Sequence, residues 1–548
     1  MPHGPMPEHP PAAPAPERVV IERVFRPADW AAFVALSAFG LAALGWFWTA
    51  WLHDGLGGQP WLRLLMIGVL LALLVNQQGR WLLLLPMRRP RPMPAPTGLR
   101  VAVVTTFVPG AESVEMVEAT LRAMTAMRYP HDSWLLDEGD DPDVRAACER
   151  LGVRHFSRKG EPTLATDEGP FRAKTKHGNY NAWLHAVGFA NYDVLVAFDP
   201  DHVPEPEYLD GVLGYFRDPG VGYVQVAQAY YNQDASFIAR GAAEETYAYF
   251  SAIQMAGYGM GYPIIVGGHN AHRMEALRAM GGLAAHDADD LMLTLRYRAA
   301  GWQGVYHPAI LARGLTPVDW RGYLVQQRRW ARSVLDLKFR HNGPFARKLP
   351  LRSRAMSLLH GLNFLHRSLA HALLALVLVY LCATGRTIAL LTERMLLPSI
   401  ALALVLAMQE FFRQRFYLDW TRESGLHWRG GLLGFAKWPW FLLAIADAVT
   451  GREVGYVVTR KASSAGIYWP FVTWQLGLAG TIGLAWWLGS RGPGESVVVA
   501  AIGASVATVA VGLALHALRA PPASYEPARA RSSVASVAST PSEFSGVP

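Results

Sequence analysis

Long apolar segments near both ends of the chain constrain its fold more than any other feature. Residues 30–52 run for 23 positions without a charged side chain, which is long enough for a helix to cross the hydrocarbon core of a bilayer. Residues 61–85 form a second candidate span or, alternatively, an interfacial helix, because four polar residues interrupt them: Asn76, Gln77, Gln78 and Arg80. Four further candidate spans are residues 369–384, 396–412, 467–488 and 497–518. Charged residues make up only 17% of the chain, against about 25% in soluble domains, so we expect a membrane protein with about six spans.

Residues 430–450 are apolar but contain Lys437, Pro439 and Asp447, and the loops on both sides of them are basic. Basic loops stay on the cytosolic side of a membrane, so this segment has to return to the side from which it started. We therefore expect a helix that lies at the membrane interface. The same rule predicts a multi-pass protein of the plasma (inner) membrane, with the lipid bilayer as a partner and with its soluble part and both tails in the cytosol.

Composition divides the chain into eight segments. They are a disordered tail (1–29), two spans (30–86), a cytosolic domain (90–345), interfacial helices (346–368), two spans (369–412), an interfacial helix with the loop after it (430–466), two spans (467–518) and a second disordered tail (519–548). The first segment lacks the apolar core of a cleavable signal peptide. Two cysteines exclude a disulfide scaffold. The net charge of +8 gathers beside apolar segments without a groove-reading motif, so nucleic acid is not an expected partner.

Within residues 90–345, β-branched apolar runs alternate with helical periodicity. The predicted strands are residues 100–107, 133–136, 193–198 and 222–229, and the predicted helices are residues 111–127 and 142–151. Asp141 followed by Pro142 is a helix start, and Gly152 follows the helix end. Such alternation builds an open, mostly parallel α/β sheet, and ligands bind beyond the carboxyl ends of its strands.

Two acidic clusters follow predicted strands. Asp137-Glu138-Gly139 comes after one strand, and Asp199-Pro200-Asp201-His202 comes after another. A carboxylate pair at a strand end suits a hard divalent cation that also holds phosphate oxygens, which makes Asp199 and Asp201 candidate ligands of Mg²⁺ or Mn²⁺. The alternative for Asp-Pro-Asp is an ordinary turn.

Three other motifs contain residues suited to chemistry. Lys176, before a predicted helix, could neutralise a diphosphate or be a solvated surface lysine. Asp290, at the start of another helix, could remove a proton from a hydroxyl or cap the helix. Gln326, Arg329 and Trp330 share one helix face and offer an amide, a guanidinium for phosphate and an indole platform for a sugar. Their alternative is a basic interfacial anchor.

Taken in order, these motifs resemble those of the processive family-2 glycosyltransferases of membranes, the cellulose synthase group. The resembling elements are Asp137-Glu138-Gly139 (Asp-Asp-Gly), Lys176-x-Gly178-Asn179 (Lys-x-Gly-Asn), Asp199-Pro200-Asp201 (Asp-x-Asp), Ala288-Asp289-Asp290 (Thr-Glu-Asp), Gln326-x-x-Arg329-Trp330 (Gln-x-x-Arg-Trp) and Tyr456-x-Val458-Thr459-x-Lys461 (the Phe-x-Val-Thr-x-Lys gating loop). The sequence departs from the pattern at Glu138, at Ala288-Asp289, at Thr105-Thr106-Phe107 and at Gly268-His269-Asn270.

The resemblance implies a cytosolic GT-A domain, Rossmann-like, inserted in a helical transmembrane bundle. It implies that Asp290 is the catalytic base and that Gln326 and Trp330 bind the acceptor. The implied nucleotide-sugar ligands are Asp137, Lys176, Asp199, Asp201, Arg329, Thr459 and Lys461.

The implied reaction is inverting transfer from a nucleotide sugar to the end of a growing β-linked polysaccharide, coupled to translocation of the product. UDP-glucose is the first expectation for the donor, ahead of GDP-mannose and UDP-N-acetylglucosamine, and an accessory secretion subunit is a possible partner. About 30 residues follow the last predicted span, so no cyclic-di-GMP-sensing PilZ domain is expected. Two alternatives are a non-processive membrane glycosyltransferase that adds one sugar to a lipid or protein, and a non-catalytic export subunit.

Overall fold

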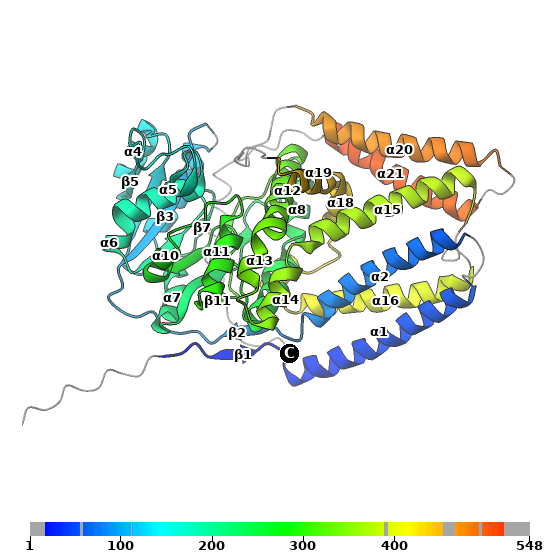
Figure 1. Cartoon of the computed structure of the whole chain (residues 1–548), viewed down its shortest axis with the longest axis horizontal. Coiled ribbons are helices and arrows are strands. Elements are labelled where there is room, and N and C mark those ends of the chain that lie inside the picture. The colour runs from blue at the N-terminus through cyan, green and yellow to red at the C-terminus, as the bar shows by residue number, and fades with distance from the viewer. Residues whose placement is uncertain are drawn as a thin grey trace, which may run out of the picture.

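The structure is a computed structural model that describes residues 17–54, 59–110, 112–387, 393–452, 466–492 and 496–519. It has an α/β domain at one end and a bundle of long helices at the other (Figure 1). Helices α8 (Phe237–Glu244), α12 (Trp320–Asp336), α18 (Trp428–Ala436) and α19 (Trp438–Thr450) lie between these two parts. Thr459 and Lys461, which were predicted to close over the nucleotide, lie outside the described residues.

The α/β domain is built on a seven-stranded sheet in the order β11-β8-β10-β6-β3-β4-β5. Strand β10 is antiparallel to its neighbours β6 and β8, and the other pairings are parallel, so the prediction of a mostly parallel sheet is confirmed. The strands are β3 (Val101–Phe107), β4 (Asp132–Asp137), β5 (Arg154–Phe156), β6 (Val194–Ala197), β8 (Val221–Val226), β10 (Asn270–Arg273) and β11 (Gln303–His307). A three-stranded sheet joins β7 (Val203–Pro204), β12 (Ala312–Gly314) and β9 (Ala229–Tyr230), and β1 (Ile21–Arg23) pairs with β2 (Arg88–Pro90).

The central strand β3 is buried on both faces. Val101, Val103 and Phe107 belong to one hydrophobic cluster, and Ala102 and Val104 belong to a second cluster across the sheet. Alternate side chains of a strand point to opposite faces, so two layers of helices cover the sheet. The remaining helices of the domain are α3 (Val114–Thr125), α4 (Pro142–Leu151), α5 (Lys176–Trp183), α6 (Phe189–Asn191), α7 (Tyr208–Leu213), α9 (Gln254–Gly259), α10 (Met274–Ala279) and α11 (Asp289–Ala299).

Local signals set the helix ends as expected. The Asp141 carboxylate accepts hydrogen bonds from the amide N–H groups of Asp143 and Val144 at the start of α4, and Gly152 ends this helix in the left-handed conformation with a φ of 67°. Helix α12 begins in the same way, because Asp319 accepts from the amide N–H of Gly322 at 2.7 Å. These caps fix both ends of α4 and the start of α12.

Five helices among the described residues are long and apolar enough to cross a membrane, and the protein is a membrane protein. They are α1 (Pro27–Asp54), α2 (Pro60–Leu82), α15 (Leu362–Thr384), α16 (Glu393–Gln414) and α21 (Val497–Arg519). Helix α20 (Trp469–Gly489) was also predicted as a span and lies beside α21, but its four tryptophans and Gln475 lower its mean hydropathy. Helices α18 and α19 meet at an angle of 47°, and as one bent span they would make a sixth crossing. The remaining α-helices of the described residues are short: α13 (Asn342–Ala346), α14 (Leu351–Leu359) and α17 (Trp420–Glu423).

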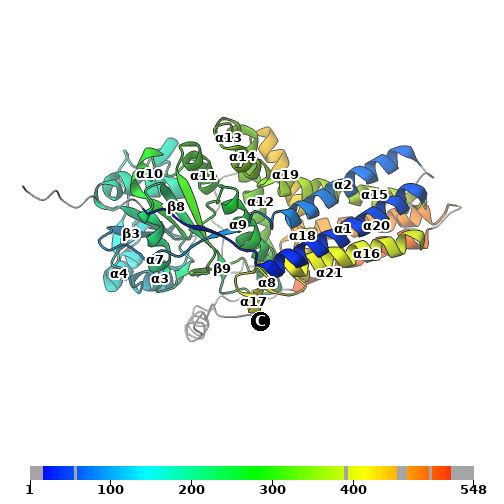
Figure 2. The same ribbon diagram turned by 90° about the horizontal axis from the view of Figure 1, so that it is seen from below.

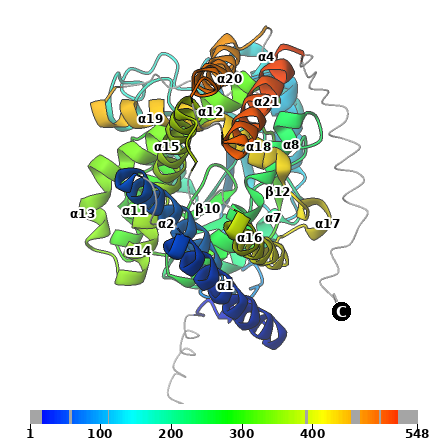
Figure 3. The same ribbon diagram turned by 90° about the vertical axis from the view of Figure 1, so that its right-hand side faces the viewer.

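The long helices extend from the α/β domain in one direction (Figures 1 and 2). Seen from the far end, α15, α20 and α21 form one group and α1, α2 and α16 form the other (Figure 3). Apolar side chains from both groups, including Phe47, Met66, Leu381 and Ile482, form a single buried cluster between them. Gln78, one of the polar residues that interrupt the second predicted span, donates to Gln409 of α16 at 3.4 Å. In this conformation the two groups of helices therefore pack against each other.

Candidate active site

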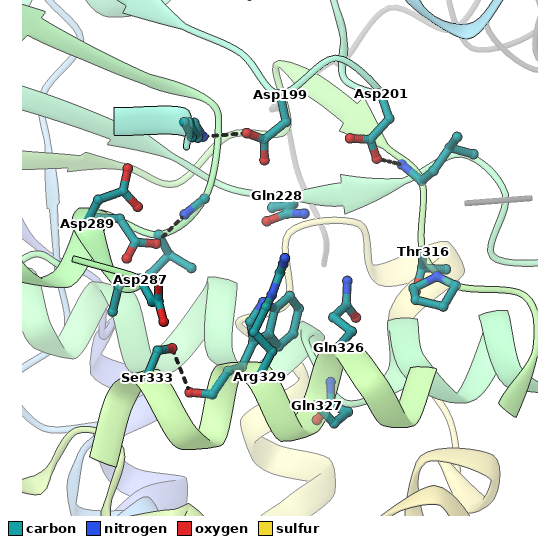
Figure 4. A pocket seen from close by; sticks show the side chains of 18 of the residues that line it. Asp199, Asp201, Gln228, Asp287, Asp289, Thr316, Gln326, Gln327, Arg329 and Ser333 are labelled. Atoms are coloured by element: carbon teal, nitrogen blue, oxygen red, sulfur yellow. Dashed lines mark hydrogen bonds and ion pairs between the residues drawn. The ribbon is translucent and has the colours of Figure 1, made fainter. Parts of the chain in front are cut away.

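A cavity of about 780 Å³ opens at the carboxyl ends of the sheet strands. Its lining includes Asp199 and Asp201 after β6, Asp289 and Asp290 at the start of α11, and residues of α12 and α15. In Figure 4, Asp199 and Asp201 lie on one side, Gln326 and Arg329 project from α12 on the other, and Gln228 lies between them. A single cavity therefore joins the edge of the sheet to the first turns of a membrane helix.

The Asp-Pro-Asp turn is held from three directions. The amide N–H of Leu315 donates to the Asp201 carboxylate at 3.1 Å, and the Thr120 hydroxyl donates to the carbonyl of Pro200 at 2.8 Å. A Cβ atom on Gly268 would lie 2.8 Å from the amide nitrogen of Asp199, so only glycine allows the two chain segments to approach this closely. The turn is thus built into the floor of the cavity and is not an ordinary surface turn.

The donor set of this turn fits a divalent cation. His202 Nδ1 lies 3.8 Å from a carboxylate oxygen of Asp199 and 3.7 Å from one of Asp201, which places an imidazole nitrogen beside two carboxylates. Hard divalent cations prefer carboxylate oxygens. Within the described residues, the two groups of three potential ligands within 4.8 Å of one another are elsewhere: Asp137, Asp140 and His155, and His286, Asp336 and His341.

Lys176 provides positive charge next to the acidic turn. Its ammonium group lies 2.5 Å from the Asp199 carboxylate. Burial opposes this charge, but Asp199 and Asp289 raise the pKa of Lys176 well above its usual value, so the group is a cation at neutral pH. Gly178 is not among the described residues that line the cavity. A Cβ there would lie 2.0 Å from the carbonyl oxygen of Arg172, and this glycine is needed for packing of the loop.

Asp137 occupies a different position from the other predicted residues. Its side chain is fully buried and accepts hydrogen bonds from the amide N–H groups of Gly139 and Asp141 and from His155. Asp137 is not among the described residues that line the cavity, whereas Glu138 is. In this conformation the Asp137 carboxylate shapes the turn after β4, and its contact with a nucleoside remains a prediction.

Glu138 replaces the family's second aspartate and binds a buried arginine. Arg158, which is 1% exposed, donates to both carboxylate oxygens of Glu138 at 2.8 and 3.1 Å. The same guanidinium donates to three carbonyl oxygens, those of Leu164, Phe171 and Arg172. Glu138 also accepts from the amide N–H of Lys174 at 2.6 Å. The pair therefore fastens the loop that leads into Lys176.

Replacing Arg158 with methionine is expected to lower the free energy of unfolding by about 3–5 kcal/mol, because it leaves the Glu138 carboxylate without its cation. Denaturation of the full chain in detergent measures this loss. Arg154→Met is the matched control: Arg154 forms an exposed pair with Asp132 at 3.1 Å, and its loss should cost about 1 kcal/mol or less. Equal losses in the two variants would show that the Arg158 cluster is not a structural anchor.

Asp289 and Asp290 line the cavity at the start of α11. The Asp290 carboxylate accepts from the amide N–H groups of Gly267 at 2.8 Å and Leu291 at 2.7 Å, which fixes its orientation. Burial raises the pKa of Asp290, and these two N–H groups oppose the rise. Burial also raises the pKa of Asp289 to about 7, against the opposing charge of Lys176. Two carboxyls with raised pKa values in one cavity suit proton transfer near neutral pH.

With Asp290 as the base, we expect kcat to decline on the acid side of its pH profile. Because Asp290 must be ionised to accept a proton, kcat should fall as the pH drops through its raised pKa, above the value of about 3.9 for a free aspartate. Lys176→Met should move this decline to higher pH, since the lysine charge lowers the pKa of Asp290. Turnover measured over about pH 4–9 tests this. A decline at or below the ordinary aspartate value would contradict it.

Helix α12 presents opposite faces to the cavity and to α19. Gln326, Arg329 and Trp330 line the cavity, as their predicted shared face requires, while Arg328 pairs with Asp447 of α19 at 2.5 Å. Trp330 remains 37% exposed, so its ring is free to stack against a ligand. The hypothesis of a purely basic membrane anchor does not fit the burial of Gln326.

A buried polar network lines the cavity where α12 approaches α18 and α19. The Lys437 ammonium donates to Glu245 at 2.6 Å, to Gln327 at 2.9 Å and to the Tyr323 hydroxyl at 3.0 Å. Nearby, the cavity reaches Arg367 on α15. The network therefore fixes the position of α12 relative to α18 and α19.

The structure brings together seven of the predicted site residues, which are Lys176, Asp199, Asp201, Asp290, Gln326, Arg329 and Trp330. Asp137 is nearby but buried away from the cavity. Residues of the cavity that were not predicted include His202, Gln228, Glu245 and Lys437. His202 directly follows the Asp-x-Asp motif and could have been included on that ground. Glu245 and Lys437 are 192 positions apart, and no local pattern links them.

Strand-end carboxylates, adjacent cations and a second carboxyl pair across one cavity define a group-transfer site that suits a sugar nucleotide. The protein is a glycosyltransferase. The chain belongs to glycosyl transferase family 21, whose family model matches residues 68–437.

Curated relatives include the UDP-forming cellulose synthase catalytic subunits of Xanthomonas axonopodis pv. citri (26% identical over 54% of this chain and 40% of the relative) and Pseudomonas fluorescens (26% identical over 45% and 32%). The match thus spans less than half the length of these relatives. Among solved structures, a mannosyltransferase from Pyrobaculum calidifontis in complex with GDP-Man and Mn²⁺ aligns with a TM-score of 0.47 and 17% identity, over 71% of this chain and 98% of that one. The predicted cellulose synthase-like glycosyltransferase, with an α/β catalytic domain joined to a helical membrane bundle, is confirmed.

Proposed function

We propose that the protein transfers a sugar, with inversion, from a nucleotide sugar to the end of a growing β-linked polysaccharide. The observation that supports this most strongly is the single cavity that contains the strand-end carboxylates, the Asp289–Asp290 pair and Arg367 at the start of α15. Sugar transfer and entry of the product into the helix bundle would then take place in the same cavity. UDP-glucose is the proposed donor, because the curated relatives are UDP-forming cellulose synthases.

The donor diphosphate would lie beside Asp199, Asp201, Lys176 and Arg329. Asp199 and Asp201 would hold Mg²⁺ or Mn²⁺, which when bound stabilises the negative charge of the leaving diphosphate. Lys176 and Arg329 would add fixed positive charge at the same place, and such preorganised charge is usually the largest catalytic contribution. Asp137 would contact the nucleoside, and Thr459 and Lys461 would close over the donor.

The acceptor hydroxyl would be activated by Asp290. Its carboxylate would take the hydroxyl proton while the oxygen attacks the anomeric carbon and the bond to the nucleoside diphosphate breaks. The Gly267 and Leu291 N–H groups hold this carboxylate in place. Trp330 would stack on the terminal sugar of the acceptor, and Gln326 would hydrogen-bond to it.

The membrane arrangement follows from the positions of the basic residues. We propose six spans, with α20 as the fifth in chain order, α18 and α19 at the interface, and the α/β domain and both tails on the cytosolic side of the plasma membrane. A polysaccharide cannot cross hydrocarbon unaided, since each unpaired hydroxyl costs a few kcal/mol. Elongation beside α15 would feed the product to the bundle, with an accessory subunit receiving it.

A second candidate is transfer of one sugar to a membrane lipid. The apolar cluster that joins both helix groups of the bundle leaves the described helices closely packed, and this observation favours an acceptor that stays in the membrane. The reaction at Asp290 would be the same, and only the acceptor would differ.

The test is release of nucleoside diphosphate by the full chain in lipid nanodiscs, with UDP-glucose, UDP-N-acetylglucosamine and GDP-mannose offered separately with Mg²⁺ or Mn²⁺. We expect metal-dependent release that is fastest with UDP-glucose. Faster release from GDP-mannose would overturn the proposed donor. Absence of release with every donor, by protein that remains folded, would overturn the proposed activity.

A further inference from the structure

Four charged residues spaced four apart run along one side of α12 and the turn after it. They are Arg328, Arg332, Asp336 and Arg340. Residues four apart lie above one another on a helix, so these side chains form a stripe. We call it the α12 stripe. It lies between the loop that precedes Asp290, residues 286–288, and the end of α19.

On one side, the stripe holds the loop before Asp290. Arg332 pairs with Asp287 at 2.5 Å, and Asp336 accepts a hydrogen bond from His286 at 3.2 Å. The Arg332 side chain is 10% exposed and that of its partner Asp287 is 32% exposed, whereas His286 and Asp336 are 10% and 11% exposed. Arg332 and Asp336 are thus screened little by solvent, and removing the partner of either one leaves a mostly buried charge uncompensated. The loop is therefore anchored at two consecutive residues.

The hydrogen bonds of His286 define its part in this anchor. Its Nδ1 atom accepts from the amide N–H of Ala288 at 2.9 Å, so in the neutral ring the proton is on Nε2, which donates to Asp336. A ring nitrogen that carries a proton cannot bind a metal. In this arrangement His286 and Asp336 thus form a structural hydrogen-bonded pair, and the His341 ring lies against that of His286 with centroids 5.3 Å apart.

On the other side, three members of the stripe contact the end of α19. Arg328 pairs with Asp447 at 2.5 Å, Arg332 donates to the carbonyl of Arg452 at 3.2 Å, and Arg340 donates to the carbonyl of Ala448 at 3.0 Å. Arginines here satisfy carbonyl groups that the helix end leaves without partners, and they oppose the negative end of the helix dipole. Arg340 also pairs with Asp336 at 2.5 Å.

Two arginines therefore bridge the loop and the helix. Arg332 contacts both Asp287 and Arg452, and Arg340 contacts both Asp336, the partner of His286, and Ala448. We propose that Arg332 and Arg340 are positioning residues, which set the place of the Asp290 loop by tying it to the end of α19. This inference rests on the proposed role of Asp290 as the base. It makes the placement of the base depend on a helix outside the α/β domain.

The first test of the bridge does not depend on activity. Amide hydrogen exchange is measured on the full chain in nanodiscs for wild type, Arg332→Gln, Asp287→Asn and the double variant. We expect exchange across residues 284–292 to rise about 10-fold or more in Arg332→Gln. The double variant should show no further increase, because both changes break the same pair. Arg321→Gln is the matched control, since Arg321 is an exposed residue of the same helix.

The second test uses turnover of UDP-glucose. In Arg332→Gln we expect kcat to fall about 10-fold or more, because a small displacement of the base is costly, while KM for the donor stays within about 2-fold. If the wild type transfers no sugar, the proposed function fails but the exchange result still reports on the bridge. Unchanged exchange across residues 284–292 in Arg332→Gln would overturn the inference. If the sheet of that variant exchanges as an unfolded chain does, Arg340→Gln provides the same test.

Discussion

Replacing Asp290 with asparagine is expected to reduce sugar transfer by about 10²–10⁴-fold, the range for loss of a general base. The amide has nearly the shape of the carboxylate, and its oxygen can still accept from Gly267 or Leu291, so the fold should be retained. What is lost is the proposed base, which would take the proton from the acceptor hydroxyl. Donor binding should change little, because the proposed contacts with the diphosphate are at Asp199 and Lys176.

The informative comparison is Asp289→Asn. Asp289 is the adjacent residue and lines the same cavity. Its carboxylate has a backbone hydrogen bond with Asp290, whereas the Asp290 carboxylate is held by the N–H groups of both Gly267 and Leu291. We expect Asp289→Asn to retain most of the activity. Initial rates of nucleoside diphosphate release, at saturating donor, compare the two variants. A larger loss in Asp289→Asn than in Asp290→Asn would mean that the base is assigned to the wrong residue.

Replacing Asp201 with asparagine is expected to lower turnover by about 10²–10³-fold, the usual cost of removing one group that stabilises transition-state charge. The amide oxygen of the new side chain could still accept from the Leu315 amide N–H, which the carboxylate accepts at 3.1 Å, so the turn should keep its shape. The variant should also need a higher concentration of Mg²⁺ or Mn²⁺ for half-maximal rate, because one carboxylate ligand is gone.

Asp143→Asn is the control for this experiment, since Asp143 is an exposed acid in the first turn of α4. It makes the same charge change outside the cavity and should leave both the rate and the metal requirement unchanged. Metal titrations of the three proteins are measured side by side. If Asp201→Asn keeps the metal requirement of the wild type, the cation is not held by the Asp-Pro-Asp turn.

Helix ends and central strands were predictable because their causes are local. The Asp141-Pro142 start and the Gly152 end of α4 match the sequence, and β3 follows its apolar run within one residue. Strand β10 and the small β7-β12-β9 sheet were not predicted, since they are two to four residues long and depend on partners far along the chain. Helix α15 begins at Leu362, seven residues before the predicted span. The prediction began too late because Asn363 and Arg367 interrupt the apolar pattern in the first turns of the helix.

The site residues also differ in how far they could be predicted. Short motifs beside a strand end or within one helix identified Asp199, Asp201, Asp290 and the cavity face of α12. The burial of Asp137 could not be read from the sequence, since it depends on three partners, two in its own turn and one on β5. The network around Lys437 and the α12 stripe join residues more than 40 positions apart, and only the fold brings them together.

The size of the product distinguishes extension of a glycan chain from transfer of a single sugar. Full-length protein in lipid vesicles is given UDP-[¹⁴C]glucose with Mg²⁺ or Mn²⁺, and the label is divided between an organic extract and an ethanol-insoluble fraction. We expect label in ethanol-insoluble polymer of many sugars per chain, and no such label with Asp290→Asn. Label confined to the organic extract as a lipid with a single sugar would contradict this expectation and would establish the lipid glycosyltransferase instead.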